Sequence, residues 1–219
     1  VGFNNSADQP LFTHSYSYDA NGNISSLSKL ADGQTSALSY QYDGLDQLIR
    51  VNDQEANKTV LYSYDASGVR LAKTINGSSY NYIYDNGVLL YADTPLGGMT
   101  FIYDNDSVIG YKYNSSYYFY LKNLQGDILG AVDASGNLLY QYRYDAWGVP
   151  TVLDAQGNPI SPDSAHIANA NPLRYRGYFF DSETGFYLTG SRYYDPVTGR
   201  FINADTTDVL TASLDSLYD

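Results

Sequence analysis

One four-residue pattern recurs along the chain and limits what it can fold into: an aromatic residue, any residue, tyrosine and aspartate. The copies are Tyr16-Ser17-Tyr18-Asp19, Tyr40-Gln41-Tyr42-Asp43, Tyr62-Ser63-Tyr64-Asp65, Tyr82-Ile83-Tyr84-Asp85, Phe101-Ile102-Tyr103-Asp104 and Tyr142-Arg143-Tyr144-Asp145. Residues i and i+2 of a strand share a face, so each copy places two rings on one side of a strand. A period of 19 to 24 residues leaves room for one β-hairpin per unit, and the longer gap after Asp104 holds a degenerate unit at Tyr120-Leu121-Lys122-Asn123.

The aspartate of each copy predicts a turn. Its carboxylate can accept a hydrogen bond from the backbone N–H two residues later. A glycine follows three residues after an aspartate at Asp19, Asp65, Asp133 and Asp154, where it supplies the positive φ of a short hairpin loop. Each unit therefore reads as strand, turn and returning strand, and the returning strands contain Leu27, Leu48, Leu71 and Leu138.

Composition agrees with an all-β fold. The 219 residues include 25 Tyr and 19 Gly, and only two of the 24 acidic residues are glutamate, so helix formers are scarce. Successive hairpins that pair side by side make a twisted antiparallel strip, which curves as strands accumulate. We expect a curved, spiralling β-strip with little helix, and a tyrosine face that is half wet because phenol hydroxyls need partners.

Charge and cysteine content exclude several functions. The formal net charge of −12 opposes binding to phosphate backbones, so DNA and RNA are not expected as main partners. The absence of cysteine excludes disulfides, thiolate zinc sites and thiol nucleophiles. No apolar stretch is long enough for a membrane span, and no motif indicates a cofactor. The start at Val1, without an initiator Met, is expected of an internal fragment.

The last third of the chain contains a second kind of motif. An Arg-Tyr-Arg-Gly-Tyr stretch is followed by two Asp-x-x-Thr-Gly turns, 14 residues apart. The defining residues are Arg174, Arg176, Gly177, Asp181, Gly185, Arg192, Tyr194, Asp195, Gly199 and Arg200. Together with the Tyr-Asp repeats, this signature resembles the Rhs repeat-associated core of the Rhs/YD-repeat family, which occurs in bacterial polymorphic toxins, wall-associated proteins, toxin-complex C subunits and teneurins.

The resemblance implies a β-strip that forms part of a hollow shell around a toxic carboxy-terminal domain of the same polypeptide, outside the cell or on a bacterial surface. It implies a strip over residues 1–142, its continuation by the signature over 143–205, and a truncated segment, 206–219. The leucines of that last segment recur at roughly helical spacing, which predicts a short helix there. It also implies self-cleavage, in which Asp205 and Arg200 match family positions. Thr206 stands where many members have proline, and the rest of the cleavage motif is missing, so the fragment is expected to have no enzymatic activity.

Other interpretations remain open. Trp147 and exposed tyrosines could bind a cell-surface glycan, which would make the chain an adhesion module. The Asp-rich loops lack the glycine and glutamate of a calcium-binding helix-loop-helix, so we expect no metal site. His14 and His166 are expected to be surface residues. The signature arginines are expected to pair with Asp181, Glu183 and Asp195. Free edges of the strip predict self-association or capping by loops.

Overall fold

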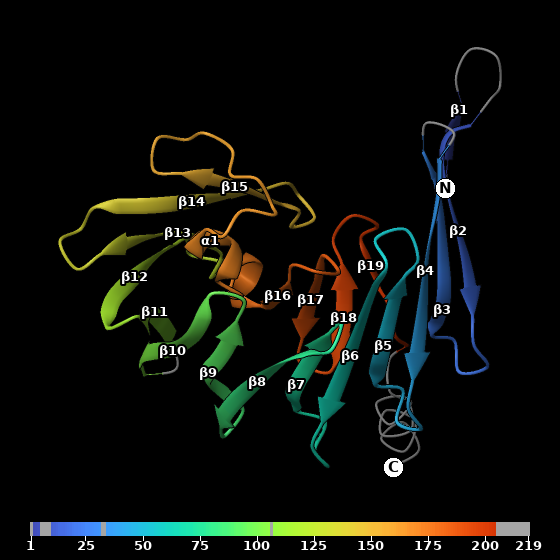
Figure 1. The fold of residues 1–219 in the computed structure, drawn as a ribbon, viewed down its shortest axis with the longest axis horizontal. Coiled ribbons are helices and arrows are strands. Elements are labelled where there is room, and N and C mark those ends of the chain that lie inside the picture. The colour runs from blue at the N-terminus through green and yellow to red at the C-terminus, as the bar shows by residue number, and fades with distance from the viewer. Residues whose placement is uncertain (1, 5–9, 32–33, 106, 205–219) are drawn as a thin grey trace, which may run out of the picture.

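The computed structural model describes residues 2–4, 10–31, 34–105 and 107–204, and within these ranges the chain is almost entirely β-structure (Figure 1). Fifteen strands form one antiparallel sheet in which each strand pairs with the next in sequence. They are β1 (Gly2–Asn4), β2 (Pro10–Tyr18), β3 (Ile24–Ala31), β4 (Gln34–Tyr42), β5 (Leu48–Asp53), β6 (Lys58–Tyr64), β7 (Arg70–Ile75), β8 (Ser78–Asp85), β9 (Val88–Thr94), β10 (Gly97–Asp104), β11 (Ser107–Tyr113), β12 (Ser116–Lys122), β13 (Ile128–Asp133), β14 (Leu138–Tyr144) and β15 (Pro150–Asp154). The predicted open, antiparallel strip of hairpins is confirmed.

The repeat tyrosines set which face of the strip is buried. Each copy of the pattern ends an even-numbered strand, and its first ring is buried in the copies at Tyr40, Tyr62, Tyr82, Phe101 and Tyr142. The degenerate unit behaves in the same way, since Tyr120 is buried. Because alternate strands run in the same direction, all Tyr-Asp turns lie along one edge of the strip, called here the YD edge.

Most turns at the YD edge follow the predicted chemistry. Oδ1 of Asp19 accepts hydrogen bonds from the N–H groups of Asn21 and Asn23, both at 2.9 Å, and Gly22 has a φ of +89°. The same pair of bonds, to the residues two and four positions later, is made by Asp43, Asp65 and Asp145 at this edge, and by Asp133 and Asp154 in the turns after β13 and β15 at the opposite edge. In the degenerate unit, the side-chain oxygen of Asn123 accepts the equivalent two hydrogen bonds.

Asp85 departs from the prediction. Its strand continues through the aspartate into a two-residue turn, in which Asn86 and Gly87 have φ values of +49° and +80°. Asn-Gly in this conformation matches the twist of the flanking strands. The turn therefore forms without the carboxylate as acceptor, and the Asp85 side chain instead accepts from the amide of Asn86.

The strip continues only to Asp154 at the end of β15, and the signature that follows leaves it, which corrects the expectation that residues 143–205 continue the strip. After β15 come the helix α1 (Ile167–Ala170), the 3-10 turn η1 (Tyr175–Gly177) and a separate four-stranded sheet of β16 (Phe179–Asp181), β17 (Phe186–Thr189), β18 (Arg192–Asp195) and β19 (Arg200–Phe201). The physical reason lies at the outer edge of β15. Leu153 bridges to Pro159, and Ile160 donates to the carbonyl of Val152, so the following loop covers that edge. Loop capping was one of the two predicted fates of a free edge.

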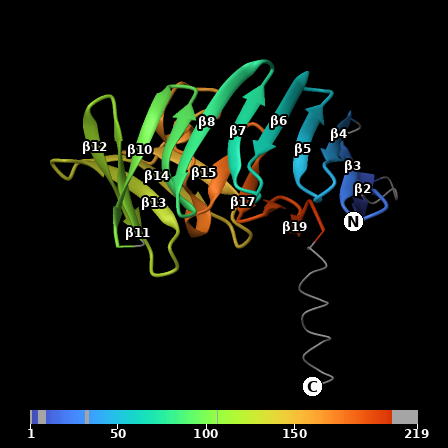
Figure 2. The same cartoon turned by 90° about the horizontal axis from the view of Figure 1, so that it is seen from below.

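The second sheet lies against the buried face of the strip, which curves over it (Figure 2). One core cluster joins strands β8 to β14 with Leu173 and Phe179, and another joins strands β3 to β6 with Phe186, Tyr193 and Ile202. The expected half-wet tyrosine face is therefore largely packed. Burial is complete enough that the hydroxyls of Tyr40, Tyr62 and Tyr82 have no hydrogen-bond partner within the described ranges.

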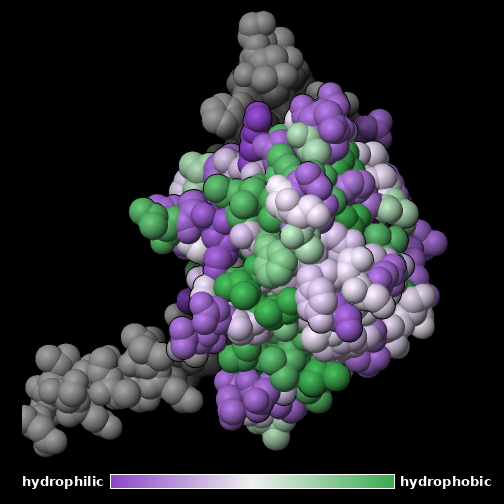
Figure 3. All heavy atoms as spheres, turned by 90° about the vertical axis from the view of Figure 1, so that its left-hand side faces the viewer, coloured by the Kyte–Doolittle hydropathy of each residue, from purple (hydrophilic) through white to green (hydrophobic). Residues whose placement is uncertain are grey.

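The opposite face of the strip carries single exposed apolar side chains, including Leu61, Leu71, Ile83, Phe119 and Leu121. Leu71 thus lies in the returning strand as expected, but it is 44% exposed and does not belong to the core. Figure 3, which views the β10–β15 end, shows apolar and polar side chains intermixed on the surface. The segment 206–219, for which a short helix was expected, lies outside the described residues.

Candidate functional site

The candidate functional site is the interface between the signature sheet and the strip. Two cations in β7 form its centre. In the units that follow Asp19, Asp43 and Asn123, the positions five and eight residues after the turn residue hold buried apolar side chains, as Leu48 and Val51 do after Asp43. After Asp65 the same positions hold Arg70 and Lys73, opposite the repeat tyrosines. Sequence reasoning missed both cations, although this break in the repeat was the signal that could have found them.

Arg70 and Lys73 form a buried ion cluster with two carboxylates of the second sheet. Asp181 is held by Nη1 of Arg70 and, at 2.8 Å, by Nζ of Lys73, which also lies 2.6 Å from Oε1 of Glu183. No side chain in the cluster is more than 9% exposed. Four charges out of water require close pairing, because an unpaired buried charge is costly. The cluster therefore fixes how the second sheet sits on the strip.

The two carboxylates respond to this environment in opposite directions. Burial opposes ionisation of Asp181, but the charges of Arg70 and Lys73 outweigh it and lower its pKa. Burial raises the pKa of Glu183, which is near only one of the two cations and is also repelled by Asp181. The same cluster thus favours ionisation of Asp181 and disfavours that of Glu183.

Aromatic rings surround the Arg70 guanidinium. Its carbon lies 4.5 Å from the ring centre of Phe179 and 4.9 Å from that of Tyr82, and Nη1 donates to the hydroxyl of Tyr193 at 3.0 Å. Rings from both sheets thus contact the cation and exclude water from the ion pair.

A second contact clamps the last hairpin of the strip. Tyr187 and Tyr194 donate from their hydroxyls to the carbonyls of Gly148 and Trp147, at 2.8 and 3.0 Å. The ring of Tyr175 covers Gly148, where a Cβ atom would lie 2.7 Å from the ring. The Trp147 side chain, the candidate glycan contact, is beside Gly199 and the residue is 61% exposed.

The signature arginines do not make the predicted ion pairs with Asp181. That carboxylate is bound by Arg70 and Lys73 of the strip, whereas Arg174 lies over the Phe180 ring at 4.4 Å and donates to backbone carbonyls of the α1 region. Asp195 accepts from Val197 and Thr198 in its own turn. The prediction was wrong because the two sheets meet face to face, which brings cations of β7 nearer to Asp181.

Arg176 is placed beside the degenerate repeat unit. Oδ1 of Asp127 accepts from the backbone N–H of Arg176 at 2.8 Å and lies 3.7 Å from its Nε. The other Asp127 oxygen accepts from the Asn123 amide at 2.6 Å. The regular turns have the reverse order, with Asp133 accepting from the amide of Asn137. The degenerate unit therefore exchanges aspartate and asparagine, which places the carboxylate at the signature.

In four of the repeats, the second tyrosine bonds its hairpin to an earlier strand or turn. Hydroxyl groups donate to backbone carbonyls 14 to 18 residues earlier, at 2.6 to 2.8 Å. The pairs are Tyr42 to Ile24, Tyr64 to Leu48, Tyr103 to Leu89 and Tyr144 to Ile128. Burial raises the pKa of Tyr103 to about 12, so this hydroxyl remains a donor at physiological pH.

The described chain leaves the second sheet next to the first hairpin. Asn203 accepts from the Tyr193 N–H at 2.9 Å, and Ala204 donates to the Asn23 side chain at 2.8 Å. Arg200 is on the exposed strand β19, with its guanidinium 5.6 Å from the Tyr16 ring centre. Asp205, the other self-cleavage candidate, lies outside the described residues.

His14 lies in β2 beside Tyr16, and Nδ1 of His166 accepts from the Ala168 N–H at the start of α1. Among the described residues, no group of three or more His, Cys, Asp or Glu side chains could hold a metal ion. No helix in the described ranges is long and apolar enough to cross a membrane.

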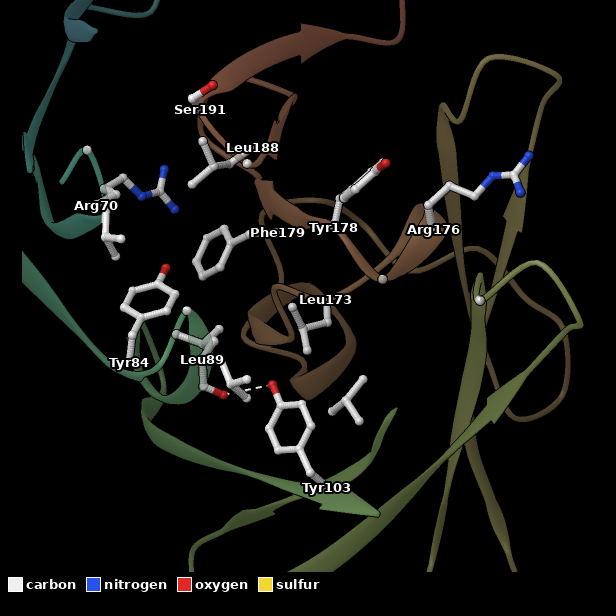
Figure 4. Close-up of a pocket in the computed structure, with 18 of the residues that line it drawn as sticks. Arg70, Tyr84, Leu89, Tyr103, Leu173, Arg176, Tyr178, Phe179, Leu188 and Ser191 are labelled. Carbon is white, nitrogen blue, oxygen red and sulfur yellow. Dashed lines mark hydrogen bonds between the residues drawn. The ribbon is translucent and has the colours of Figure 1, made fainter. Parts of the chain in front are cut away.

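A cavity of about 660 Å³ opens between the YD edge and the second sheet (Figure 4). Its walls include Arg70, Tyr84, Leu89, Phe179 and Leu188.

Known proteins share this architecture. The family model described as Teneurin YD-shell matches residues 13–217. A protein named tRNA3(Ser)-specific nuclease WapA, from Bacillus spizizenii, is 37% identical over 197 residues, which cover 87% of this chain and 8% of the relative. A protein named Double-stranded DNA deaminase toxin A, from Burkholderia cenocepacia, is 24% identical over 225 residues, which cover 87% of this chain and 15% of the relative.

A solved structure, described as the crystal structure of TcdB2-TccC3-Cdc42, superimposes with a TM-score of 0.58 at 16% identity. The match covers 92% of this chain and 12% of that chain. At this identity the match concerns the fold alone. In every one of these relatives, the chain corresponds to a small part of a much longer polypeptide.

Proposed function

Because this chain belongs to the Rhs/YD-repeat family and is a segment of its shell, we propose that it forms part of the wall around a toxin domain carried by the same polypeptide. The single observation that carries the proposal is the curved strip seated on the signature sheet by the buried ion cluster. A continuous sheet with one face packed against a second sheet can act as a wall. Such a role needs no catalytic residue.

The relatives support a structural role. One is named as a tRNA nuclease and another as a DNA deaminase, yet both contain a segment that aligns with 87% of this chain. The shared segment makes up 8% and 15% of those proteins, which leaves most of each polypeptide to carry its own named activity. This pattern supports a structural role for the common segment, with the named activities in other parts of those polypeptides.

The charge of this segment suits that division. Enzymes that act on nucleic acids need basic surface at the site of contact, whereas this chain carries a net charge of −12. The segment itself has no nucleic-acid partner under this proposal. Secretion, or display on a bacterial surface, follows from the role of a toxin container, and the absence of cysteine is compatible with it.

The proposal is tested with a polypeptide in which this segment is followed by its toxin domain. We expect the toxin domain to resist protease and to be inactive while the shell is intact, and to become cleavable and active once the shell is opened by denaturant. A toxin domain equally protease-sensitive with and without the shell would contradict the proposal.

A second candidate, a glycan-binding module, is favoured by the 61% exposure of Trp147. A glycan array with the wild-type chain and with Trp147→Ala separates the two functions. A specific sugar ligand that is lost in the variant would favour adhesion, and the absence of any ligand would remove this candidate.

Self-cleavage is a third and separate proposal, because it requires residues that follow Asp219. An extended polypeptide that cleaves itself, and fails to do so as Asp205→Asn, would establish it. An extended wild-type polypeptide that stays intact would remove it.

A further inference from the structure

Asp46 breaks the glycine pattern of the turns that an Asp or Asn side chain stabilises. Three residues after the turn residue, the backbone takes a positive φ, and glycine holds this position with φ values of +84° to +97°. The glycines are Gly22, Gly68, Gly126, Gly136, Gly148 and Gly157. After Asp43 the same position holds Asp46, with a φ of +58°. A residue with a Cβ atom is less stable than glycine in this conformation, so a compensating contact of its side chain is expected.

The carboxylate of Asp46 holds two asparagine side chains of the neighbouring turn. Its Oδ1 accepts from Nδ2 of Asn23 at 2.7 Å and from Nδ2 of Asn21 at 2.8 Å. Asn23 also donates to the aspartate of its own turn, as Asn137 and Asn158 do in theirs. Those two asparagines are exposed, whereas Asn23 is 0% exposed. Two carboxylates thus fix the amide group of Asn23 in one orientation.

This amide binds the polypeptide where it leaves the second sheet. Oδ1 of Asn23 accepts from the N–H of Ala204 at 2.8 Å. The N–H of Ile24 donates to the carbonyl of Ile202 at 3.0 Å, and the Tyr42 hydroxyl lies 3.1 Å from the same oxygen. The first two hairpins of the strip therefore hold the outgoing backbone as far as Ala204.

The second sheet holds the same stretch from its other side. Oδ1 of Asn203 accepts from the Tyr193 N–H at 2.9 Å, and the Ile202 N–H donates to the Tyr193 carbonyl at 2.8 Å. Asn203 is buried between the two partners. The residue that follows Ala204 in the sequence is Asp205, the candidate for self-cleavage.

We propose that Asp46 and Asn23 are positioning residues for self-cleavage, because they fix the backbone directly before Asp205. Asp46 orients the Asn23 amide, and that amide binds the N–H of Ala204. Hydrolysis joins the hydroxyl of one water to a peptide carbonyl carbon and transfers its proton to the leaving nitrogen, and the rate depends on how precisely the reacting groups are held. This inference rests on the self-cleavage proposal and is independent of toxin enclosure and of glycan binding.

Hydrogen exchange of the ¹⁵N-labelled chain tests the contact itself. Asp46→Gly removes the carboxylate and leaves a residue that takes the positive φ freely, so the turn should keep its shape. We expect exchange at the Ala204 amide to become about threefold to tenfold faster, because the Asn23 amide loses a hydrogen-bond partner. Asp46→Asn keeps an acceptor oxygen and tolerates the same φ, so it should retain the slow exchange.

A matched control makes a similar change elsewhere on the YD edge. Asn86 has a φ of +49° in an exposed turn, and its side chain bonds to Asp85. Asn86→Gly removes a side chain at a positive φ, as Asp46→Gly does, and should leave exchange at Ala204 unchanged. Equal acceleration in the two glycine variants would overturn the inference, because it would show a general loosening of the strip.

Self-cleavage of the extended polypeptide tests the role. Asp46→Gly should slow cleavage by about tenfold or more, Asp46→Asn should restore most of the rate, and Asn86→Gly should cleave like the wild type. Unchanged cleavage in Asp46→Gly, or a rate that Asp46→Asn does not restore, would overturn the inference and leave self-cleavage in place. An extended wild-type polypeptide that stays intact would overturn both.

Discussion

Nζ of Lys73 lies 2.8 Å from Oδ1 of Asp181, a residue 108 positions further along the chain, and this contact joins the strip to the second sheet inside the core. Arg70 binds the other oxygen of the same carboxylate. The packing of the second sheet against the strip therefore depends on one carboxylate that is bound by two cations of the same strand.

Removal of that anion should be severely destabilising. Asp181→Asn leaves Arg70 and Lys73 buried with only Glu183 to balance them, and we expect the free energy of unfolding to fall by about 3–5 kcal/mol. Urea denaturation followed by circular dichroism measures the change. Asp85→Asn, at an exposed turn position, is the control and should change stability little. A loss below about 1 kcal/mol in Asp181→Asn would show that the cluster does not hold the two sheets together.

Glu183 should give stability a pH dependence. Burial raises its pKa above the value of 4.5 for the unfolded chain, so the folded state binds the proton more tightly. This contribution is fully present below 4.5 and is lost as the pH rises through the folded pKa. Unfolding free energies measured from pH 4.5 to 8 should show it in the wild type, and Glu183→Gln should remove it. Parallel pH profiles for the two proteins would contradict the assignment.

Asp181 should act in the opposite direction at lower pH. The two cations lower its pKa below the unfolded value of 3.8, despite the opposing effect of burial. The stabilisation is present above 3.8 and is lost as the pH falls through the folded pKa. The difference in stability between the wild type and Asp181→Asn should thus be constant above pH 3.8 and shrink only as the pH falls below that value, and a difference that already closes above pH 3.8 would argue against the lowered pKa.

The degenerate unit should not tolerate the residue that most other units have. Asn123→Asp sets a second carboxylate against Asp127, and we expect a loss of about 1 kcal/mol from repulsion and the lost amide donor. Asn123→Asp combined with Asp127→Asn restores the arrangement of Asp133 and Asn137 and should recover part of the loss. A double-mutant cycle in urea measures the coupling. Additive effects would show that the two positions are not coupled in their contribution to the free energy of unfolding.

Alanine substitutions at two glycines can measure how tightly the Tyr175 ring packs on the last hairpin. Gly148 and Gly157 have similar positive φ values, +97° and +87°, so alanine is strained at both. Only at Gly148 would the new methyl group meet the Tyr175 ring, whereas nothing lies within 4 Å of it at Gly157. Gly148→Ala should therefore cost about 1–3 kcal/mol more than Gly157→Ala in thermal unfolding. Equal losses would show that the ring moves aside without cost.

Short-range chemistry made the strip predictable from sequence. An aspartate such as Asp19 binds N–H groups two and four residues away, and Gly22 takes its positive φ within the same turn. Alternation then placed one ring of each repeat in the core. Leu71 lies in the returning strand as expected, but it faces outward because Arg70 and Lys73 hold the inward positions of its unit, and the carboxylate that binds both lies in the second sheet.

The sequence by itself thus determined the elements of this protein, an antiparallel strip of hairpins with Asp-Gly turns, because each turn and each strand face is decided by residues only a few positions apart. The tertiary structure alone decided that the signature leaves the strip and lies across its buried face. It also decided that Asp181 pairs with cations more than 100 residues away in the sequence. Those contacts depend on how far the sheet curves and on which loop covers its last edge, and such distances accumulate over many strands instead of being fixed within any one repeat.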